Sequence, residues 1–177
     1  MEKYISKKEK ASYGFAAVGS YMVAGITQSY LMYFFTDILI IPSAFVMMLM
    51  IVARVWDALN DPMMGVIVDR TSTKYGKMRP YVLIGSFLML VTTIVLFMPL
   101  TGAPTMFKMI FAADSYIIFG MAYTLTDVPA MGLMSVATPN SDERASLLSF
   151  YVTVGSVGSL LPVGLLTIFQ SFIPEKY

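Results

Sequence analysis

The stretch R-V-W-D-A-L-N-D, residues 54–61, decides how this chain must fold. It lies within an apolar segment, residues 42–68, that is longer than the roughly 20 residues a helix needs to cross a bilayer. Arg54, Asp57 and Asp61 follow the spacing i, i+3, i+7 and therefore share one face of that helix. Charges within a bilayer are costly and face a bundle interior or a water-filled cavity. The stretch therefore predicts an ion or substrate site; the alternative is a structural Arg–Asp pair that joins two helices.

The composition is that of a membrane protein. Hydrophobic residues make up 57% of the 177 residues and charged residues only 13%, whereas average soluble chains are about 25% charged. The chain has no cysteine and no histidine, which excludes disulfides and zinc sites of the usual kind, so we expect no transition-metal site. The net charge of +1 gives no indication of nucleic-acid binding.

Five apolar segments separated by short polar turns predict an all-α membrane protein with about five transmembrane helices. Small residues are frequent in the first and fifth segments and let helices approach closely. The third segment is almost wholly apolar and is expected to be a scaffold helix. The expected spans are residues 11–35, 43–68, 81–99, 106–137 and 145–172.

Basic residues in the short turns are concentrated on one side of the membrane, which is typically the cytoplasmic side. The opposite side has only Lys108 and Lys176. This asymmetry predicts a multi-pass protein of the plasma (inner) membrane with a cytoplasmic N-terminus. The residues on the expected cytoplasmic side are Lys3, Lys7, Lys8, Lys10, Arg70, Lys74, Lys77, Arg79 and Arg144.

The second and fourth expected spans run in the same direction, so their carboxylates can lie at one depth. At 1.5 Å per residue, Asp61 and Asp127 lie roughly 8 Å, and Asp57 about 2 Å, to the cytoplasmic side of the midplane. Together with Thr124 and Asn60 they offer only oxygen ligands, which suit a small hard cation. Crowded carboxylates also bind protons. Sodium, lithium and protons therefore stay open as ligands of these five residues, and chemistry alone does not exclude calcium.

Three segments together resemble a known family. G-V-I-V-D-R-T-S-T-K-Y-G-K-M-R-P, residues 65–80, resembles the cytoplasmic loop signature between spans 2 and 3 of the major facilitator superfamily. With D-A-L-N-D-P-M-M-G at 57–65 and Y-T-L-T-D-V-P at 123–129, the chain resembles the glycoside–pentoside–hexuronide:cation symporter family, to which melibiose permease belongs. The resemblance covers the whole chain and implies that residues 1–177 are part of an N-terminal six-helix half.

The resemblance also implies roles for individual residues. By position, Asp57, Asp61 and Asp127 match the family's cation-binding and coupling aspartates, and Thr124 matches the neighbouring threonine. Arg54 matches an arginine that supports this site. For Asp127 the resemblance also implies contact with the substrate. Tyr123, one turn before it, is expected either to line the cavity or to pack in the core. A gating role is expected for Asp69, Arg70, Lys77 and Arg79 in the basic loop.

Two departures from melibiose permease concern the sugar. The Lys-Asp pair that contacts sugar there corresponds to Ser20 and Tyr21 here, and an arginine in span 5 corresponds to Val152. Tyr21 is therefore retained as a candidate substrate residue, but melibiose is not carried over as the substrate. A different sugar, a glucuronide or another amphiphile stays open, because relatives of the family move lysolipids.

The expected function is secondary symport of a sugar or glycoside coupled to sodium or protons, with no other cofactor and no covalent chemistry. Members of this family are built from two six-helix halves that rock about the substrate. The expected partners are therefore the lipid bilayer and a C-terminal half, without which the chain should not transport. The alternatives are a membrane assembly subunit whose charges pair with partner helices and, with less support, a cation-selective channel.

Overall fold

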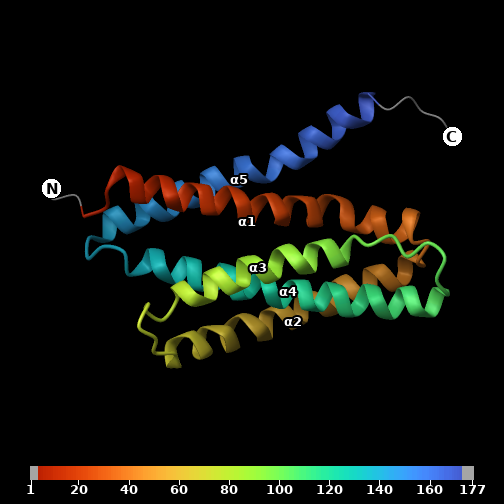
Figure 1. The fold of residues 1–177 in the computed structure, drawn as a ribbon, viewed down its shortest axis with the longest axis horizontal. Helices are drawn as coiled ribbons and strands as arrows, with labels where there is room; N and C mark the ends of the chain where they lie inside the picture. The colour runs from red at the N-terminus through yellow and green to blue at the C-terminus, as the bar shows by residue number, and fades with distance from the viewer. Residues whose placement is uncertain (1–3, 173–177) are drawn as a thin grey trace. The chain divides into compact units, whose positions relative to one another are not determined.

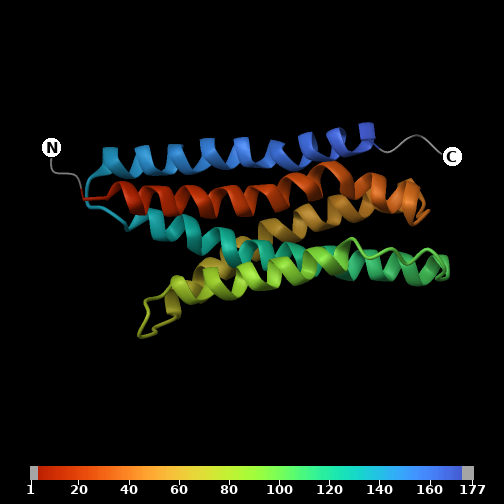
Figure 2. The same ribbon diagram turned by 45° about the horizontal axis from the view of Figure 1, so that its top comes forward.

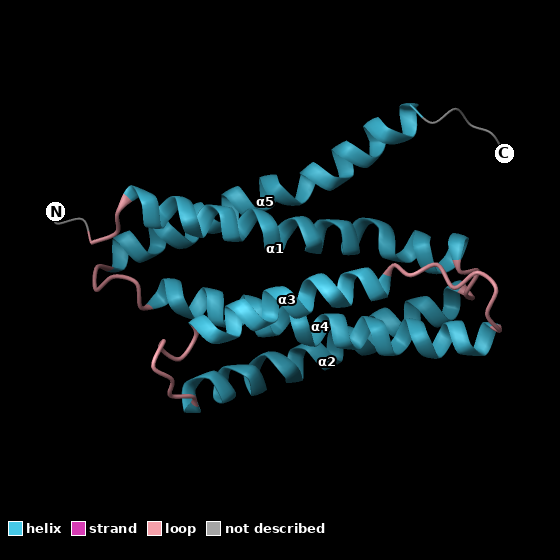
Figure 3. Cartoon of the chain, viewed as in Figure 1, coloured by secondary structure: helices cyan, strands magenta, loops and turns pink. Residues whose placement is uncertain are grey.

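A computed structural model of the chain describes residues 4–172, apart from the side chains at 167 and 169–172, so Lys3 and Lys176 of the charge asymmetry lie outside it. Within this range all the regular structure is helical (Figure 3). The five long helices expected from the sequence are confirmed. Their bounds are α1 Lys7–Tyr33, continued by the π-helix η1 Phe34–Ile38, then α2 Ser43–Arg70, α3 Arg79–Leu96, α4 Thr105–Ser135 and α5 Ser141–Phe172.

Four of these helices are long and apolar enough to cross a membrane: α2, α3, α4 and residues Ser141–Leu166 of α5. Helix α1 has 27 residues, about 40 Å at 1.5 Å per residue, but it is not among the four in the described part of the chain. Its small and polar residues, such as Ser20, Thr27 and Gln28, lower its hydropathy. The chain is a multi-pass membrane protein.

Several helix ends differ from the expected ones because of local capping. Helix α1 begins four residues early, where the Ser6 amide donates to Glu9 Oε2 at 2.8 Å and the Glu9 amide donates to Ser6 Oγ at 3.2 Å. This is a capping box, in which two residues satisfy each other's free N–H groups. The same bond to the Ser6 amide, followed by one from the Ser6 hydroxyl, lowers the pKa of Glu9 below its usual range.

Helix α5 also begins earlier than expected, at Ser141, inside what the sequence indicated was a polar turn. The Asn140 Oδ1 atom accepts hydrogen bonds from the amides of Asp142 at 2.9 Å and Glu143 at 3.4 Å. An asparagine in this position satisfies the first N–H groups of a helix. Helix α3 ends at Leu96 instead of residue 99, because Pro99 disfavours helical backbone in the residue before it.

The helices cluster into two units, the first Met1–Tyr30 with Met134–Tyr177 and the second Leu31–Leu133. In the first unit, α1 and α5 run side by side in the same direction (Figures 1 and 2). Four residues form its buried centre, Ala17, Met134, Leu147 and Tyr151. A hypothetical Cβ on Gly25 would lie only 2.4 Å from the Ser159 carbonyl oxygen, and one on Gly158 only 2.9 Å from Val18 Cα. The small residues of these helices therefore allow close packing, as expected from the sequence.

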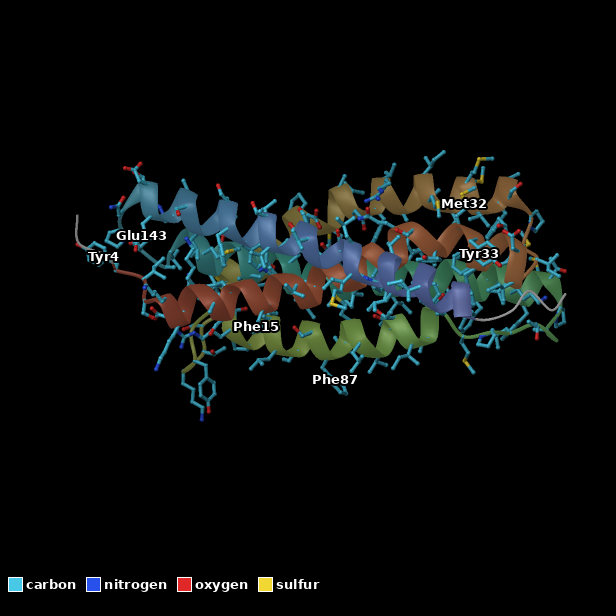
Figure 4. All side chains as sticks on the ribbon, turned by 90° about the horizontal axis from the view of Figure 1, so that it is seen from above. Tyr4, Phe15, Met32, Tyr33, Phe87 and Glu143 are labelled. Atoms are coloured by element: carbon cyan, nitrogen blue, oxygen red, sulfur yellow. The ribbon has the colours of Figure 1, made fainter. Side chains whose placement is uncertain are left out.

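The N-terminal segment of the first unit is held by one side chain of α5. The amides of Tyr4 and Ile5 donate to the two carboxylate oxygens of Glu143 at 3.3 and 3.1 Å, and the Thr138 hydroxyl donates to Glu143 Oε2 at 2.8 Å. Figure 4 labels Tyr4 and Glu143, which lie beside each other at the start of the two helices.

In the second unit, α2 and α4 are parallel and α3 runs against α4. Thr124 of α4 contacts Asp61 of α2, and a Cβ on Gly120 would approach Asp57. The later residue of α4 thus meets the later residue of α2, so the two helices run in the same direction. On α3, Gly85 packs so closely on α4 that a Cβ there would lie 2.9 Å from the backbone nitrogen of Thr126.

Helix α3 has the two-sided character of a scaffold helix. Gly85, Met89, Thr92 and Leu96 are buried along one stripe. Large apolar side chains such as Phe87 project away from the helix and are exposed (Figure 4). In a membrane protein such a surface faces lipid.

Candidate cation and substrate site

The polar residues of α2 lie at the edge of its buried stripe. That stripe comprises Val46, Leu49, Ala53, Asn60, Met64 and Val68. Asp57 is one-third exposed, whereas Asp61 and Arg54 are exposed. The helix therefore buries one narrow stripe, and its charges border an accessible face; other apolar side chains of α2, such as Val55 and Leu59, are exposed as well.

Arg54 and Asp57 form an ion pair of 3.9 Å within a single helix. This corrects the alternative interpretation of an Arg–Asp pair that joins two helices. The Arg54 side chain is 71% exposed and the contact is long, so the pair contributes little to stability. It leaves Asp61 without a cationic partner among the described residues.

The contact that joins α2 to α4 is a hydrogen bond between two expected site residues. The Thr124 hydroxyl, which is buried, donates to Asp61 Oδ1 at 2.9 Å. A hydrogen bond to a carboxylate is roughly twice as strong as one between neutral groups. The second and fourth helices therefore meet at this level through Thr124 and Asp61, while a meeting of their carboxylates stays a prediction.

Two other expected ligands have polar atoms that are buried without a hydrogen-bond partner in the described chain. They are Oδ1 of Asp127 on α4 and Nδ2 of Asn60 on α2. Asn60 is only 9% exposed. Buried polar groups are almost always paired, because the loss of water without replacement costs about 1–3 kcal/mol per group. These two side chains are thus in a state that a ligand or water would stabilise.

The negative charges of this region form a series along the two helices. Asp61 is close enough to interact electrostatically with Asp57 on its own helix and with Asp127 on α4. Arg54 is the cation that interacts with Asp57. The three carboxylates do not converge in one place, since no group of three acidic side chains suited to a metal ion occurs among the residues that the structure describes. The arrangement can hold a cation only by contributions from several oxygen types.

Two residues of α4 that the sequence analysis did not single out also face this region. A Cβ on Gly120 would lie 3.1 Å from Asp57 Oδ1, so the absence of a side chain there lets α4 approach Asp57. The half-buried Tyr116, one turn before Gly120, interacts electrostatically with Arg54 and Asp57. Tyr116, Gly120 and Thr124 are spaced by four residues and therefore share one face of α4. This spacing could have identified them from the sequence.

The expected substrate residues lie in different surroundings. Tyr123 is half-buried, with its ring centroid 6.4 Å from that of Phe119 on the same helix. Tyr21 belongs to the first unit, where its ring lies edge-on to that of Tyr151 at 6.0 Å and against Gly155. Tyr21 therefore packs between α1 and α5, and its contact with substrate stays a prediction.

The basic loop after α2 makes local contacts through the backbone. The Lys77 ammonium donates to the Asp69 carbonyl oxygen at 3.1 Å, which joins the loop to the end of α2. The side chains of Asp69, Arg70 and Arg79 have no ion-pair partner within residues 4–172. Their expected gating role is thus a prediction about contacts with other parts of a transporter.

Comparisons with known proteins agree with this picture. Residues 12–176 match the family described as MFS/sugar transport protein. Over 161 residues the chain is 37% identical to the uncharacterized symporter YjmB of Bacillus subtilis, covering 90% of this chain and 35% of that protein. It is 34% identical over 161 residues to the inner membrane symporter YicJ of Escherichia coli, covering 89% and 34%. It is 33% identical over 162 residues to the putative glycoside/cation symporter YagG of Escherichia coli, covering 91% and 35%.

The chain thus spans about a third of the length of these curated relatives. The match runs through α2, the basic loop and α4, where the polar residues of the candidate site lie. The family consists of transporters, not enzymes. The chain belongs to the MFS/sugar transport protein family and is similar within it to the glycoside–pentoside–hexuronide:cation symporters.

Proposed function

We propose that this chain provides the cation site of a secondary symporter that couples movement of a sugar or glycoside to that of sodium or protons. The observation that carries the proposal is the polar contact between α2 and α4, where Thr124 is bonded to Asp61. Beside it lies the buried Oδ1 of Asp127, which has no hydrogen-bond partner among the described residues. An oxygen-rich region at membrane depth with unsatisfied groups is the default place for an ion or substrate.

The chemistry of the site follows from its charges. Asp57, Asp61 and Asp127 repel one another when ionised in a medium of low dielectric constant, and Arg54 offsets only part of that charge. A monovalent cation or a proton neutralises a further carboxylate. Thr124 keeps one Asp61 oxygen oriented, and Asn60 supplies an amide oxygen. Binding of the cation thereby lets α2 and α4 close around the site.

Asp127 also suits a role in substrate binding, because a carboxylate oxygen without a partner accepts a hydrogen bond from a sugar hydroxyl. Tyr123 lies one turn earlier on the same helix and provides an aromatic surface. The relative YagG is named a putative glycoside/cation symporter, which supports this substrate class. Ser20, Tyr21 and Val152 take the place of the melibiose permease sugar contacts, so we propose a sugar or glycoside other than melibiose.

The proposed transport cycle needs a second helical half. Alternating access rocks one bundle against another about a central site. The basic loop, with Arg70, Lys77 and Arg79, would pair with acids of that half and hold one face shut, while Asp69 holds the loop locally through its carbonyl. The excess of basic residues on the side of this loop supports a cytoplasmic N-terminus in the plasma membrane.

Uptake into right-side-out vesicles tests the proposal. The chain is produced together with the C-terminal half of a full-length relative such as YjmB, and labelled glycosides are offered under sodium, lithium or proton gradients. Uptake driven by one cation is expected, with at least a tenfold loss in Asp127→Asn. The matched control is Asp114→Asn, the same change at an exposed position of α4, which should leave uptake unchanged. Uptake that is independent of every gradient would contradict cation coupling, and uptake by the 177 residues alone would contradict the need for a second half.

The alternative of an assembly subunit predicts a different result from the same substitutions. Asp57→Asn in a symporter removes cation dependence while the protein stays folded and inserted. In an assembly subunit, loss of the Asp57 charge would instead release the chain from its partners. Co-purification of the chain and the second half, with uptake measured on the same vesicles, separates the two.

A further inference from the structure

The turn that joins η1 to α2 ends the first helix in a strained conformation. Ile40 has φ of 56°, the one non-glycine residue of the described chain with a positive φ. This left-handed region crowds the Cβ atom, so the residue that follows a helix end in this way is usually glycine. A β-branched residue here is a genuine outlier. Such a conformation persists only where the surroundings hold it.

Backbone hydrogen bonds and packing hold one side of this turn. The Leu39 amide donates to the Phe34 carbonyl oxygen at 3.0 Å, and the Ile41 amide donates to that of Phe35 at 2.9 Å. The ring of Phe34 lies 5.2 Å from that of Phe97, centroid to centroid. These contacts account for the amides of Leu39 and Ile41 but leave the carbonyl of Leu39, at the end of the helix, without a helical partner.

Lys108, in the first turn of α4, supplies that partner. Its ammonium donates to the Leu39 carbonyl oxygen at 3.0 Å, although the two residues are 69 apart in sequence. Leu39 is fully buried and Lys108 is only 7% exposed. A cation is favourable beside the carboxyl end of a helix, whose carbonyl groups carry partial negative charge. In the described chain Lys108 has no acidic partner, so this carbonyl is its one fixed contact.

We infer that Lys108 is a clamp that holds the turn between η1 and α2 in its strained conformation, and that breaking this hydrogen bond releases the turn. The clamp joins the turn to α4, the helix that also carries Thr124 and Asp127. A movement of the first helical turn of α4 would therefore strain or break this hydrogen bond and so act on the turn between η1 and α2. This device is independent of the identity of the transported substrate or cation.

The absence of cysteine from the chain allows a direct test of the clamp. Ile38, which is partly exposed at the end of η1, is replaced by cysteine as a single reporter, and its labelling by N-ethylmaleimide is followed in detergent. Lys108→Met keeps an unbranched side chain of nearly the same length but removes the donor. We expect labelling at least tenfold faster in this variant, and an unchanged rate in the control Lys74→Met, a loop lysine. An unchanged rate in Lys108→Met would overturn the inference.

A rescue experiment separates release of strain from general damage. Glycine adopts a positive φ without strain, so Ile40→Gly should return the labelling rate of the Lys108→Met chain to within about threefold of the original. Failure of this rescue would show that Lys108 does not act through the strained turn. If Lys108→Met alone does not fold, recovery of folded protein in the double variant is the expected result and its absence overturns the inference. Ile40→Gly alone should raise the melting temperature; a fall would show that the turn is not strained.

Discussion

Helices α1 and α5 meet in one way, and α2 and α4 meet in another. The first pair packs backbone against backbone, with space for no more than a hydrogen atom at Gly25 and Gly158. The second pair meets through polar side chains. Thr124 and Asp61 are bonded, whereas Asp127 and Asn60 each keep a buried atom without a partner in the described chain. The α1–α5 contact is made by backbone and small residues, whereas we propose that a ligand completes the α2–α4 contact. The two contacts should therefore respond differently to substitution.

The largest effect is expected from a methyl group placed in the α1–α5 contact. Gly25→Ala brings a Cβ to 2.4 Å from a backbone oxygen, which cannot move without the helix. We expect a loss of about 3 kcal/mol in the free energy of unfolding, and a melting temperature lower by roughly 6–12 °C, because overpacking of a tight contact forces backbone shifts. Thermal unfolding in detergent measures the change in melting temperature.

The matched control for this substitution is Gly19→Ala on the same helix, where a Cβ would meet nothing within 4 Å. Alanine there should stabilise the helix slightly, by about 0.5–1 kcal/mol. Equal melting temperatures for the two variants would show that α1 and α5 do not pack as described.

The next effect concerns the hydrogen bond in the α2–α4 contact. Thr124→Val keeps the shape of the side chain but removes the donor to Asp61. A hydrogen bond to a charged group contributes about 2 kcal/mol, so the cation concentration for half-maximal uptake should rise roughly thirtyfold. Thr124→Ser keeps the hydroxyl and should stay within about threefold of the original. A cation affinity unchanged in the valine variant would remove Thr124 from the proposed site.

A smaller effect is expected where α4 approaches Asp57. In Gly120→Ala the new Cβ meets a movable carboxylate oxygen at 3.1 Å, not backbone. The Asp57 side chain can rotate away, so we expect less than about 1 kcal/mol of destabilisation and a threefold to fivefold loss of cation affinity. Gly65→Ala, a position of α2 with open space around it, is the control. A loss of stability as large as that in Gly25→Ala would mean that the backbone of α4 is also in contact there.

The smallest effect is a pH dependence at the start of α1. Hydrogen bonds from the Ser6 amide and hydroxyl lower the pKa of Glu9 in the folded chain. Its stabilisation of the helix start is therefore present above the usual glutamate pKa of about 4.3 and is lost as pH falls through the lower folded pKa. Amide hydrogen exchange at Ser6, corrected for the intrinsic rate, should show this loss. Glu9→Gln should abolish the pH dependence, and its persistence would assign it to another group.

Much of the candidate site could be predicted from the sequence. The spacing of Arg54, Asp57 and Asp61 placed them on one face of a helix, and the alternation of spans made the second and fourth helices parallel. The sequence did not show that Arg54 pairs within its own helix, nor that Gly120 and Tyr116 face Asp57. Tyr21 was matched to a sugar contact by position, but the structure places it against Tyr151 and Gly155.

The sequence by itself determined the class of the protein, its five helices and the polar faces of two of them. Helical periodicity and hydropathy are local properties, and bilayer thickness sets the length of each span. Only the tertiary structure decided which atoms meet: Thr124 with Asp61, and Lys108 with the carbonyl of Leu39. The rotation of each helix about its axis, and the partner that a charged side chain finds, result from packing between segments far apart in the sequence.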